Sequence, residues 1–433
     1  MRVILLLMLL CSASLSAQDT GIESAAMAAE RLLDQENTAD ITAFIDTYMG
    51  EVADRPALVA QIRALQRELA GLRDGIMLDV EDAGAILTLI GNGVEKRLLV
   101  AYDFDARRVT GLSVLPPEER LTFDPEHPEG AVKYMLERGM AGLLYVESDG
   151  KVLIEQPFGM ANESLGVAND TSTIFAIGSR PIDFTVAAIL LLDQRGELSL
   201  DDTLGVHLEG VPADKRDMTL SHLMTGQSGL PDFFHNDSDW DADLQWIGRE
   251  EAVNRLLSQP LRFAPGTGRA HSHGAYGLLA AIVELVSGKS YMAFLKENFF
   301  IPAGMERTGE YGDRQDFSLE DFAVGGGPQF VGLPNIPPNW GPTSWLIKGS
   351  GGMYSTLGDL RRFYTLVRGD QVFDAEHSRR FRGSSVEVDG SVRGFELFSV
   401  SEPPSAQLFL FLNRPGDPAE RRKIFRGLEG LVK

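Results

Sequence analysis

The stretch Thr173-Ile-Phe-Ala-Ile-Gly-Ser-Arg-Pro-Ile-Asp-Phe-Thr-Val-Ala-Ala-Ile-Leu-Leu-Leu192 predicts a short strand, a turn and a buried helix. Pro181 suits a first helical turn, because the N–H that proline lacks has no partner there. From Phe184 to Leu192 apolar residues occupy nearly every position, which is typical of a helix buried on all sides. Arg195-Gly196 supplies the cation and the glycine of a helix end. Ser179 therefore lies where the helix dipole favours developing negative charge, a position suited to a nucleophile.

The composition limits the classes of partner. The 433 residues include 40 Lys and Arg against 62 Asp and Glu, a formal net charge of −22. Such a surface repels nucleic acid and anionic membranes, so we expect neither as a partner. After the N-terminal residues no stretch is long and apolar enough to span a bilayer, and we expect no membrane span.

Residues 1–17 have the pattern of a secretory signal peptide. A basic residue, Arg2, precedes the apolar run Val3–Leu10, and small residues lead to a cleavage site near Ala17. The protein is therefore expected to be periplasmic or secreted. Cys11 is the sole cysteine, so the mature chain would have no disulfide, no cysteine ligand and no cysteine nucleophile.

The remaining chain divides into two expected domains. Residues 18–118 show helical spacing and then strand-like runs, which predicts a small α+β accessory domain. Residues 119–433 open with a helix near 129–139, continue with two strands around Asp149-Gly150, a hairpin signal, and end with two further strands after a helical middle. This order predicts one antiparallel sheet, built from both ends of the domain and flanked by helices.

The landmarks of the second domain resemble, in their order, the serine β-lactamase and penicillin-binding-protein superfamily, in particular its class C β-lactamase-related, esterase-like branch. They include Phe175-Ala-Ile-Gly-Ser179, Gly196-Glu-Leu-Ser-Leu-Asp-Asp202, Ser228-Gly-Leu-Pro231, Pro265-Gly-Thr267, Gly351-Gly-Met-Tyr-Ser-Thr356 and Gly394-Phe395 with Leu412-Asn413. The resemblance implies an α+β transpeptidase fold preceded by the small domain. It also implies a hydrolase ancestry and a small-molecule or peptide ligand, either peptidoglycan-like or an ester.

Three catalytic elements of that superfamily are altered here. Active members carry a serine with a lysine three residues later, and the resemblance places the serine at Ser179 and the lysine at Ile182. The Tyr-x-Asn element is His271-Ser272-His273, and the Lys- or His-x-Gly element is Val388-Asp389-Gly390. Gly390 survives, and the backbone N–H of Ser391 could bind the substrate oxygen together with that of Ser179. A further departure is Gly226, where relatives usually carry a histidine.

Two hypotheses follow. In the first, the protein is a catalytically impaired pseudoenzyme with a binding or regulatory role, because Ile182 and Val388 cannot replace the lost cations. In the second, it is an active serine hydrolase of the esterase or peptidase type, with His271 as the general base for Ser179. His273, itself a candidate substrate-binding residue, or Asp183 would then orient His271.

A metal site is a further alternative. His271 and His273 have the spacing of metal ligands, and His222, His235 or Asp232 could add a third. The sequence fixes no third ligand, so we expect neither a metal nor another cofactor. The acidic run 232–243 is interpreted as a solvated loop at the rim of the cleft.

Overall fold

The fold is described from a computed structural model. It covers residues 4–7, 20–33, 38–72, 75–81, 83–92, 94–116, 121–236, 238–241, 244–327, 332–369, 371–382, 388–391, 393–402 and 406–432. The chain forms two compact units, Met1–Arg120 and Leu121–Lys433, and each is described by itself. The boundary expected from the sequence, after residue 118, lies two residues earlier than the division between the units.

The first unit packs helices against a five-stranded sheet. Its helices are α1 (Thr20–Leu33), α2 (Thr38–Phe44), which continues as a π-helical segment (Ile45–Met49), and α3 (Arg55–Glu68). Its strands, in sheet order, are β1 (Ile4–Leu7), β2 (Gly75–Glu81), β3 (Gly84–Gly91), β4 (Val94–Asp103) and β5 (Arg108–Leu115). Apolar side chains of the three helices and of β3, β4 and β5 form its core.

Strand β1 falls inside the predicted signal peptide. It pairs in parallel with β2, Ile4 opposite Gly75 and Leu7 opposite Leu78. The expected cleavage site near Ala17 lies outside the described residues, and cleavage of residues 1–17 stays a prediction.

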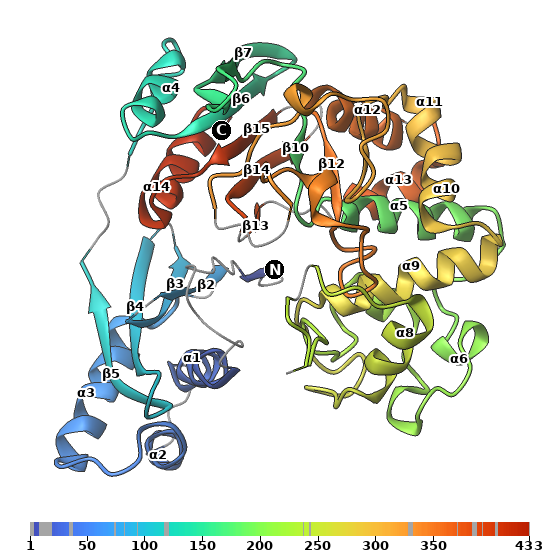
Figure 1. Ribbon diagram of the computed structural model, residues 1–433. Coiled ribbons are helices and arrows are strands. Elements are labelled where there is room, and N and C mark those ends of the chain that lie inside the picture. Colours follow the sequence, from blue (N-terminus) through green and yellow to red (C-terminus); the bar gives the residue numbers. More distant parts are fainter. Residues whose placement is uncertain are drawn as a thin grey trace. The chain divides into compact units, whose positions relative to one another are not determined.

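The second unit is built on one antiparallel sheet (Figure 1). Its order is β13 (Val388–Ser391), β14 (Phe395–Glu402), β15 (Ala406–Arg414), β6 (Ala141–Ser148) and β7 (Lys151–Phe158). The β6–β7 hairpin turns at Asp149 and Gly150, whose φ angles of 50° and 75° are those of the tight turn that the Asp-Gly pair predicts. The expectation that one sheet draws strands from both ends of the domain is confirmed.

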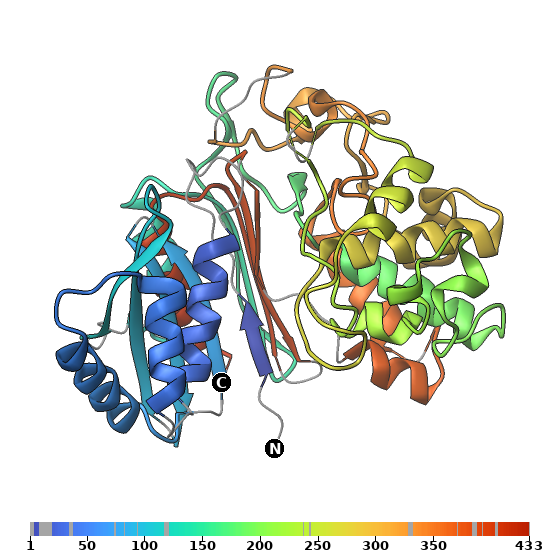
Figure 2. The same ribbon diagram turned by 90° about the horizontal axis from the view of Figure 1, so that it is seen from below.

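Alternate side chains of this sheet enter two different cores. Leu144 and Val146 of β6 face a core formed with α4 (Glu129–Leu136) and α14 (Pro418–Glu429). Leu143 and Tyr145 belong instead to the large core of the helical half. A strand directs successive side chains to opposite faces, so the sheet is covered on both sides. Figure 2 shows the sheet nearly edge-on, with the helical half along one face.

The helical half holds the remaining elements of the unit. Its helices are α5 (Pro181–Gln194), α6 (Leu204–His207), α7 (Leu220–Met224), α8 (Arg249–Ser258), α9 (His273–Ser287), α10 (Tyr291–Leu295), α11 (Ile301–Ala303), α12 (Leu357–Arg368) and α13 (Ala375–Arg382). Short strands are β8 (Met160–Asn162) with β9 (Val167–Ala168), and β10 (Phe175–Ala176), β12 (Met353–Ser355) and β11 (Gly309–Glu310), which pair in that order.

Helix α5 confirms the prediction for the opening stretch. It begins at Pro181 and ends at Gln194, and every residue from Pro181 to Leu192 is buried. Arg195 follows as the C-cap residue, and Gly196 adopts a positive φ of 69°. Because α5 is buried on all sides, the turn that precedes it is held in place by the core rather than by surface contacts.

Across the described ranges no single helix has the length and apolar composition to cross a membrane. One bent pair, α9 with residues 291–303, passes the same test by length and composition, with a bend of 75° between its two parts.

The burial of α5 predicts a large effect of truncating its side chains. Leu190 is fully buried, so Leu190→Ala should lower the free energy of unfolding of the second unit by about 2–5 kcal/mol, through lost apolar burial and the cavity left behind. All four tryptophans, Trp240, Trp246, Trp340 and Trp345, lie in this unit, so urea unfolding followed by tryptophan fluorescence reports on it.

The matched control is Val206→Ala on α6, where the valine is 63% exposed. It should change the free energy of unfolding by less than about 0.5 kcal/mol. Equal effects of the two substitutions would contradict the described packing of α5.

Candidate active site

Ser179 lies in the turn between β10 and α5. Its carbonyl accepts a hydrogen bond from Ile182 N at 2.9 Å, and Ile177 N on the other side donates to Met353 O of β12 at 3.1 Å. The serine side chain is half-buried, whereas its neighbours Ile177 and Arg180 are buried. The turn is therefore fixed at both ends while the hydroxyl keeps partial access to solvent.

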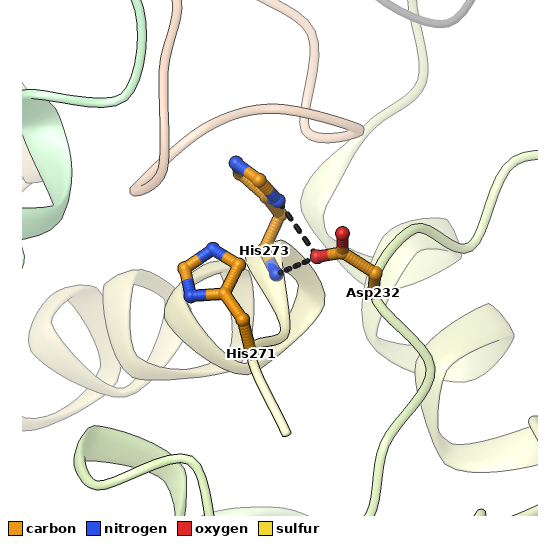
Figure 3. Close-up of side chains that lie close together, drawn as sticks. All are labelled: Asp232, His271 and His273. Carbon is orange, nitrogen blue, oxygen red and sulfur yellow. Dashed lines mark hydrogen bonds and ion pairs between the residues drawn. The ribbon is translucent and has the colours of Figure 1, made fainter. Parts of the chain in front are cut away.

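Two further side chains extend a chain of hydrogen bonds from Ser179. Its Oγ lies 3.1 Å from Nε2 of His273. On the other side of the imidazole, Nδ1 of His273 lies 2.8 Å from Oδ1 of Asp232 (Figure 3). A serine hydroxyl, an imidazole and a carboxylate in this order can act as nucleophile, general base and orienting group.

The first turn of α9 holds the histidine in place. Ser272 is its N-cap: its hydroxyl accepts from Ala275 N at 3.1 Å and donates to Pro231 O at 2.7 Å. The backbone N–H of His273 donates to Oδ1 of Asp232 at 3.1 Å, and Gly274 N donates to Asp232 O at 3.1 Å. The loop that carries Asp232 is thus bonded directly to the start of α9, which fixes the carboxylate and the imidazole relative to each other.

Aromatic contacts complete the surroundings of the imidazole. Phe233 stacks on His273 with ring centroids 4.5 Å apart and planes 13° apart. His271 meets the same ring edge-on, with centroids 4.6 Å apart and planes at 84°. Rotation of the His273 ring is therefore restricted from two directions as well as by Asp232.

The environment keeps Asp232 ionised. Its burial would raise the pKa, but the charge of His273, the hydrogen bond from its ring, the charge of His271 and the hydrogen bond from the His273 backbone together outweigh that effect. The net result lowers the pKa of Asp232 to about 2. A carboxylate that stays charged beside Nδ1 can stabilise a protonated imidazole.

His273, two residues after the His271 that the sequence predicts as general base, is the histidine that lies within hydrogen-bond distance of Ser179 Oγ. His271 lies beside that pair, and burial, with a contribution from the charge of His273, lowers the pKa of His271 to about 4 although Asp232 opposes the shift. His273 is the first residue of α9, whereas His271 lies in the segment before the helix.

Asp183, the other orienting group considered from the sequence, has different partners. It is fully buried on α5, and its Oδ2 accepts from Tyr364 OH at 2.6 Å and lies 3.5 Å from the guanidinium of Arg180. The carboxylate that bonds the ring of His273 is Asp232. Sequence reasoning interpreted Asp232 as part of a solvated loop, but its side chain is only 6% exposed. The available sequence signal for a role of Asp232 at the site was its position directly after the landmark Ser228–Pro231.

The other altered positions lie in defined elements. Ile182 is 1% exposed in the large core, so the position expected for the catalytic lysine is filled by apolar packing. Val388, Gly390 and Ser391 belong to β13, the last strand of the sheet order, opposite Phe398, Glu396 and Phe395 of β14.

The glycine at position 226 also has a physical reason. Gly226 adopts a φ of 72°, and a Cβ there would lie 2.9 Å from the carbonyl oxygen of Ala270. Its own carbonyl accepts from Ala270 N at 2.8 Å. Residue 226 thus lies directly against the segment that leads to His271, and a side chain would push the two apart.

The lowered pKa of Asp232 predicts a pH-dependent contribution to stability. A carboxyl whose folded-state pKa lies below its unfolded value, about 3.9, stabilises the fold above that pH and loses this contribution as the pH falls through the folded-state pKa. Above pH 4 the free energy of unfolding of wild type should therefore exceed that of Asp232→Asn by about 2 kcal/mol. This difference should shrink as the pH falls from 4 to about 2.

The measurement is urea unfolding of both proteins across this pH range. The Asp170→Asn variant is a control, because that carboxylate also has a lowered pKa but lies outside the hydrogen-bonded chain at Ser179. A stability difference between wild type and Asp232→Asn that stays constant from pH 6 to pH 2 would contradict the depressed pKa.

Comparison with known proteins identifies the family of the second unit. A sequence profile of the beta-lactamase family matches residues 129–398, more than half of the chain. Penicillin-binding protein 4* of Bacillus subtilis is 31% identical over 235 residues, which cover 51% of each protein. D-aminopeptidase of Brucella anthropi is 30% identical over 60% of this chain and 48% of its own length. The chain thus spans about half the length of these two relatives.

Two other similar proteins cover more of their own length. Esterase EstB of Burkholderia gladioli is 28% identical over 62% of this chain and 78% of the esterase. The crystal structure of a penicillin-binding protein from Bacillus halodurans shares the fold, with a TM-score of 0.56, 22% identity, and coverage of 70% of this chain and 98% of that one. With the profile match over residues 129–398, the chain belongs to the beta-lactamase family, within the serine β-lactamase and penicillin-binding-protein superfamily.

Proposed function

We propose that this chain is an active serine hydrolase in which Ser179 is the nucleophile, His273 the general base and Asp232 the orienting carboxylate. The observation that carries the proposal is the continuous pair of hydrogen bonds, 3.1 Å from Ser179 Oγ to His273 Nε2 and 2.8 Å from His273 Nδ1 to Asp232 Oδ1. Both distances are within the range required for proton transfer and for orientation of the base.

The reaction follows from these positions. His273 Nε2 takes the proton of Ser179 as Oγ attacks the carbonyl carbon of the substrate, and Asp232 stabilises the imidazolium. His273 then gives the proton to the leaving amine or alcohol, which departs and leaves an acyl group on Ser179. Water attacks this acyl-enzyme with His273 again as the base, and Ser179 is regenerated with release of the acid. The backbone N–H groups of Ser179 and Ser391 are the proposed donors to the oxyanion.

This mechanism differs from that of relatives with a lysine on the nucleophile helix. The apolar residue Ile182 cannot accept the serine proton, and this loss motivated the expectation of an impaired enzyme. Here the base comes from the start of α9. The charge that a lysine would bring is replaced by an imidazole held against a buried carboxylate, Asp232. A purely binding or regulatory role is the alternative. In that case substitution of any of the three residues leaves turnover unchanged.

The proposed substrates are amides or esters of small acyl groups, including D-amino-acid amides. Relatives named D-aminopeptidase and esterase support this class, and penicillin-binding protein 4* supports a peptidoglycan-like peptide as ligand. Ordinary β-lactamase activity is not proposed. The signal-like residues 1–17 support a periplasmic or secreted location, where such substrates occur.

The test is turnover of p-nitrophenyl acetate and of D-alanine p-nitroanilide by the purified protein and its variants. Ser179→Ala and His273→Gln should each lower kcat/KM at least about 10³-fold, and Asp232→Asn by about 10²–10⁴-fold. His271→Gln should cost far less, under about tenfold, because His271 makes no contact with Ser179 in this mechanism.

Two outcomes would contradict the assignment. If His271→Gln and His273→Gln exchanged these effects, the base would be His271. If wild type and Ser179→Ala hydrolysed both substrates at the same slow rate, the hydrolase proposal would fail, and ligand binding by an inactive site would be the remaining function.

A further inference from the structure

His271 is a titratable group at the site for which the proposed mechanism has no use. It lies on the segment before α9, half-buried, with its ring edge-on to His273. A neutral imidazole is the form in which histidine binds transition metals.

Asp232 supplies a second unused ligand atom. Its Oδ1 bonds the backbone and the ring of His273, but Oδ2 is buried and has no hydrogen-bond partner among the residues that the structure describes. A buried ionised oxygen without a partner is costly, and a cation is one way to satisfy it.

One ligand atom each from Asp232, His271 and His273 lie within 4.8 Å of one another. Atoms bonded to a single Zn²⁺ at about 2.1 Å lie within about 4 Å of one another, so small side-chain rotations suffice to bring these three onto one ion. Two imidazoles and one carboxylate match the preference of Zn²⁺ and similar ions, not that of Mg²⁺ or Ca²⁺, which favour oxygen ligands. Figure 3 shows the ring of His273 facing Asp232, with the ring of His271 beside that of His273.

Among the residues that the structure describes, neither His222 nor His235 belongs to this group. The Nδ1 of His222 accepts a hydrogen bond from Thr219 N at the cap of α7, and the ring of His235 lies 6.2 Å from that of Phe233. The third ligand that the sequence left open is therefore Asp232.

We propose that Asp232, His271 and His273 form a binding site for Zn²⁺ or a similar transition-metal ion, and that the bound ion inhibits the enzyme. On binding, the ion takes the place of the proton between Nδ1 of His273 and Asp232, and the neutral imidazole then carries its one ring proton on Nε2, the nitrogen that faces Ser179. With Nδ1 bound to the metal, the imidazole and the carboxylate are no longer arranged to accept the proton of Ser179. Ser179 lies at Nε2, on the other side of the ring, and is not a ligand.

Metal binding is independent of the proposed function, whereas inhibition rests on it. The experiment therefore measures both. Full-length protein is treated with chelator, exchanged into metal-free buffer and titrated with Zn²⁺ by calorimetry, and metal content is then measured after gel filtration.

Wild type and Ser179→Ala should each bind one Zn²⁺ per chain. His271→Gln and Asp232→Asn should each weaken binding at least tenfold. His207→Gln is the matched control, because His207 also pairs with an aspartate, Asp202 at 3.0 Å, but lies outside the proposed site. The His207→Gln variant should bind Zn²⁺ as wild type does. Mg²⁺ should not bind. Thermal unfolding of each variant separates loss of the site from loss of the fold, and His271→Asn serves as a second variant if His271→Gln does not fold.

In the activity arm, the ratio of ester turnover with and without Zn²⁺ is compared for each variant. Zn²⁺ should inhibit the wild-type enzyme, and EDTA should reverse the inhibition. The His271→Gln variant should be at least tenfold less sensitive to inhibition by Zn²⁺.

Absence of Zn²⁺ binding by wild type, or unchanged binding by His271→Gln, would overturn the proposed metal site. An inactive protein that binds Zn²⁺ as described would refute the hydrolase proposal alone, and an active enzyme that binds no Zn²⁺ would refute the metal site alone.

Discussion

The hydrogen bond between Ser179 and His273 depends on two elements that are 94 residues apart in the chain. The serine is placed by α5, whose complete burial leaves its preceding turn no freedom to move. The histidine is placed by the start of α9, where Ser272 and Asp232 between them satisfy backbone N–H groups of the first turn. A shift of one residue at either helix start would separate the hydroxyl from the imidazole. The chemistry of the site is thus a consequence of where two helices begin.

Two buried aspartates in this unit show how differently a carboxylate can be used. Asp183 lies within the core beside Arg180 and Tyr364, and burial, together with the charge of Asp183 and the hydrogen bond to it, raises the pKa of Tyr364. Removing one partner of such a pair leaves a buried charge uncompensated, so its role is structural. Asp232 instead faces a titratable imidazole whose other nitrogen reaches a half-buried hydroxyl. Only the second arrangement can couple a buried charge to proton transfer at a partly exposed hydroxyl.

The sequence predicted the fold more completely than the site. Apolar periodicity, the Pro181 and Arg195-Gly196 boundaries of α5 and the Asp149-Gly150 turn are local signals, and each corresponds to the observed element. The position of Ser179 followed from the same signals. Which histidine lies beside Ser179 did not, because distinguishing His271 from His273 requires the orientation of each ring, which depends on the start of α9. Asp232 is 41 residues from His273, and its burial arises from tertiary packing that no local pattern encodes.

The central claim is that Ser179 is activated as a nucleophile by His273, and covalent labelling tests it most directly. The protein is incubated at neutral pH with a fluorophosphonate probe, and the modified peptide is located by mass spectrometry. An activated serine gives a single adduct on Ser179, and the adduct is lost in His273→Gln while the protein stays folded. A wild-type protein that forms no adduct, or one that labels equally well without the imidazole of His273, would contradict the account.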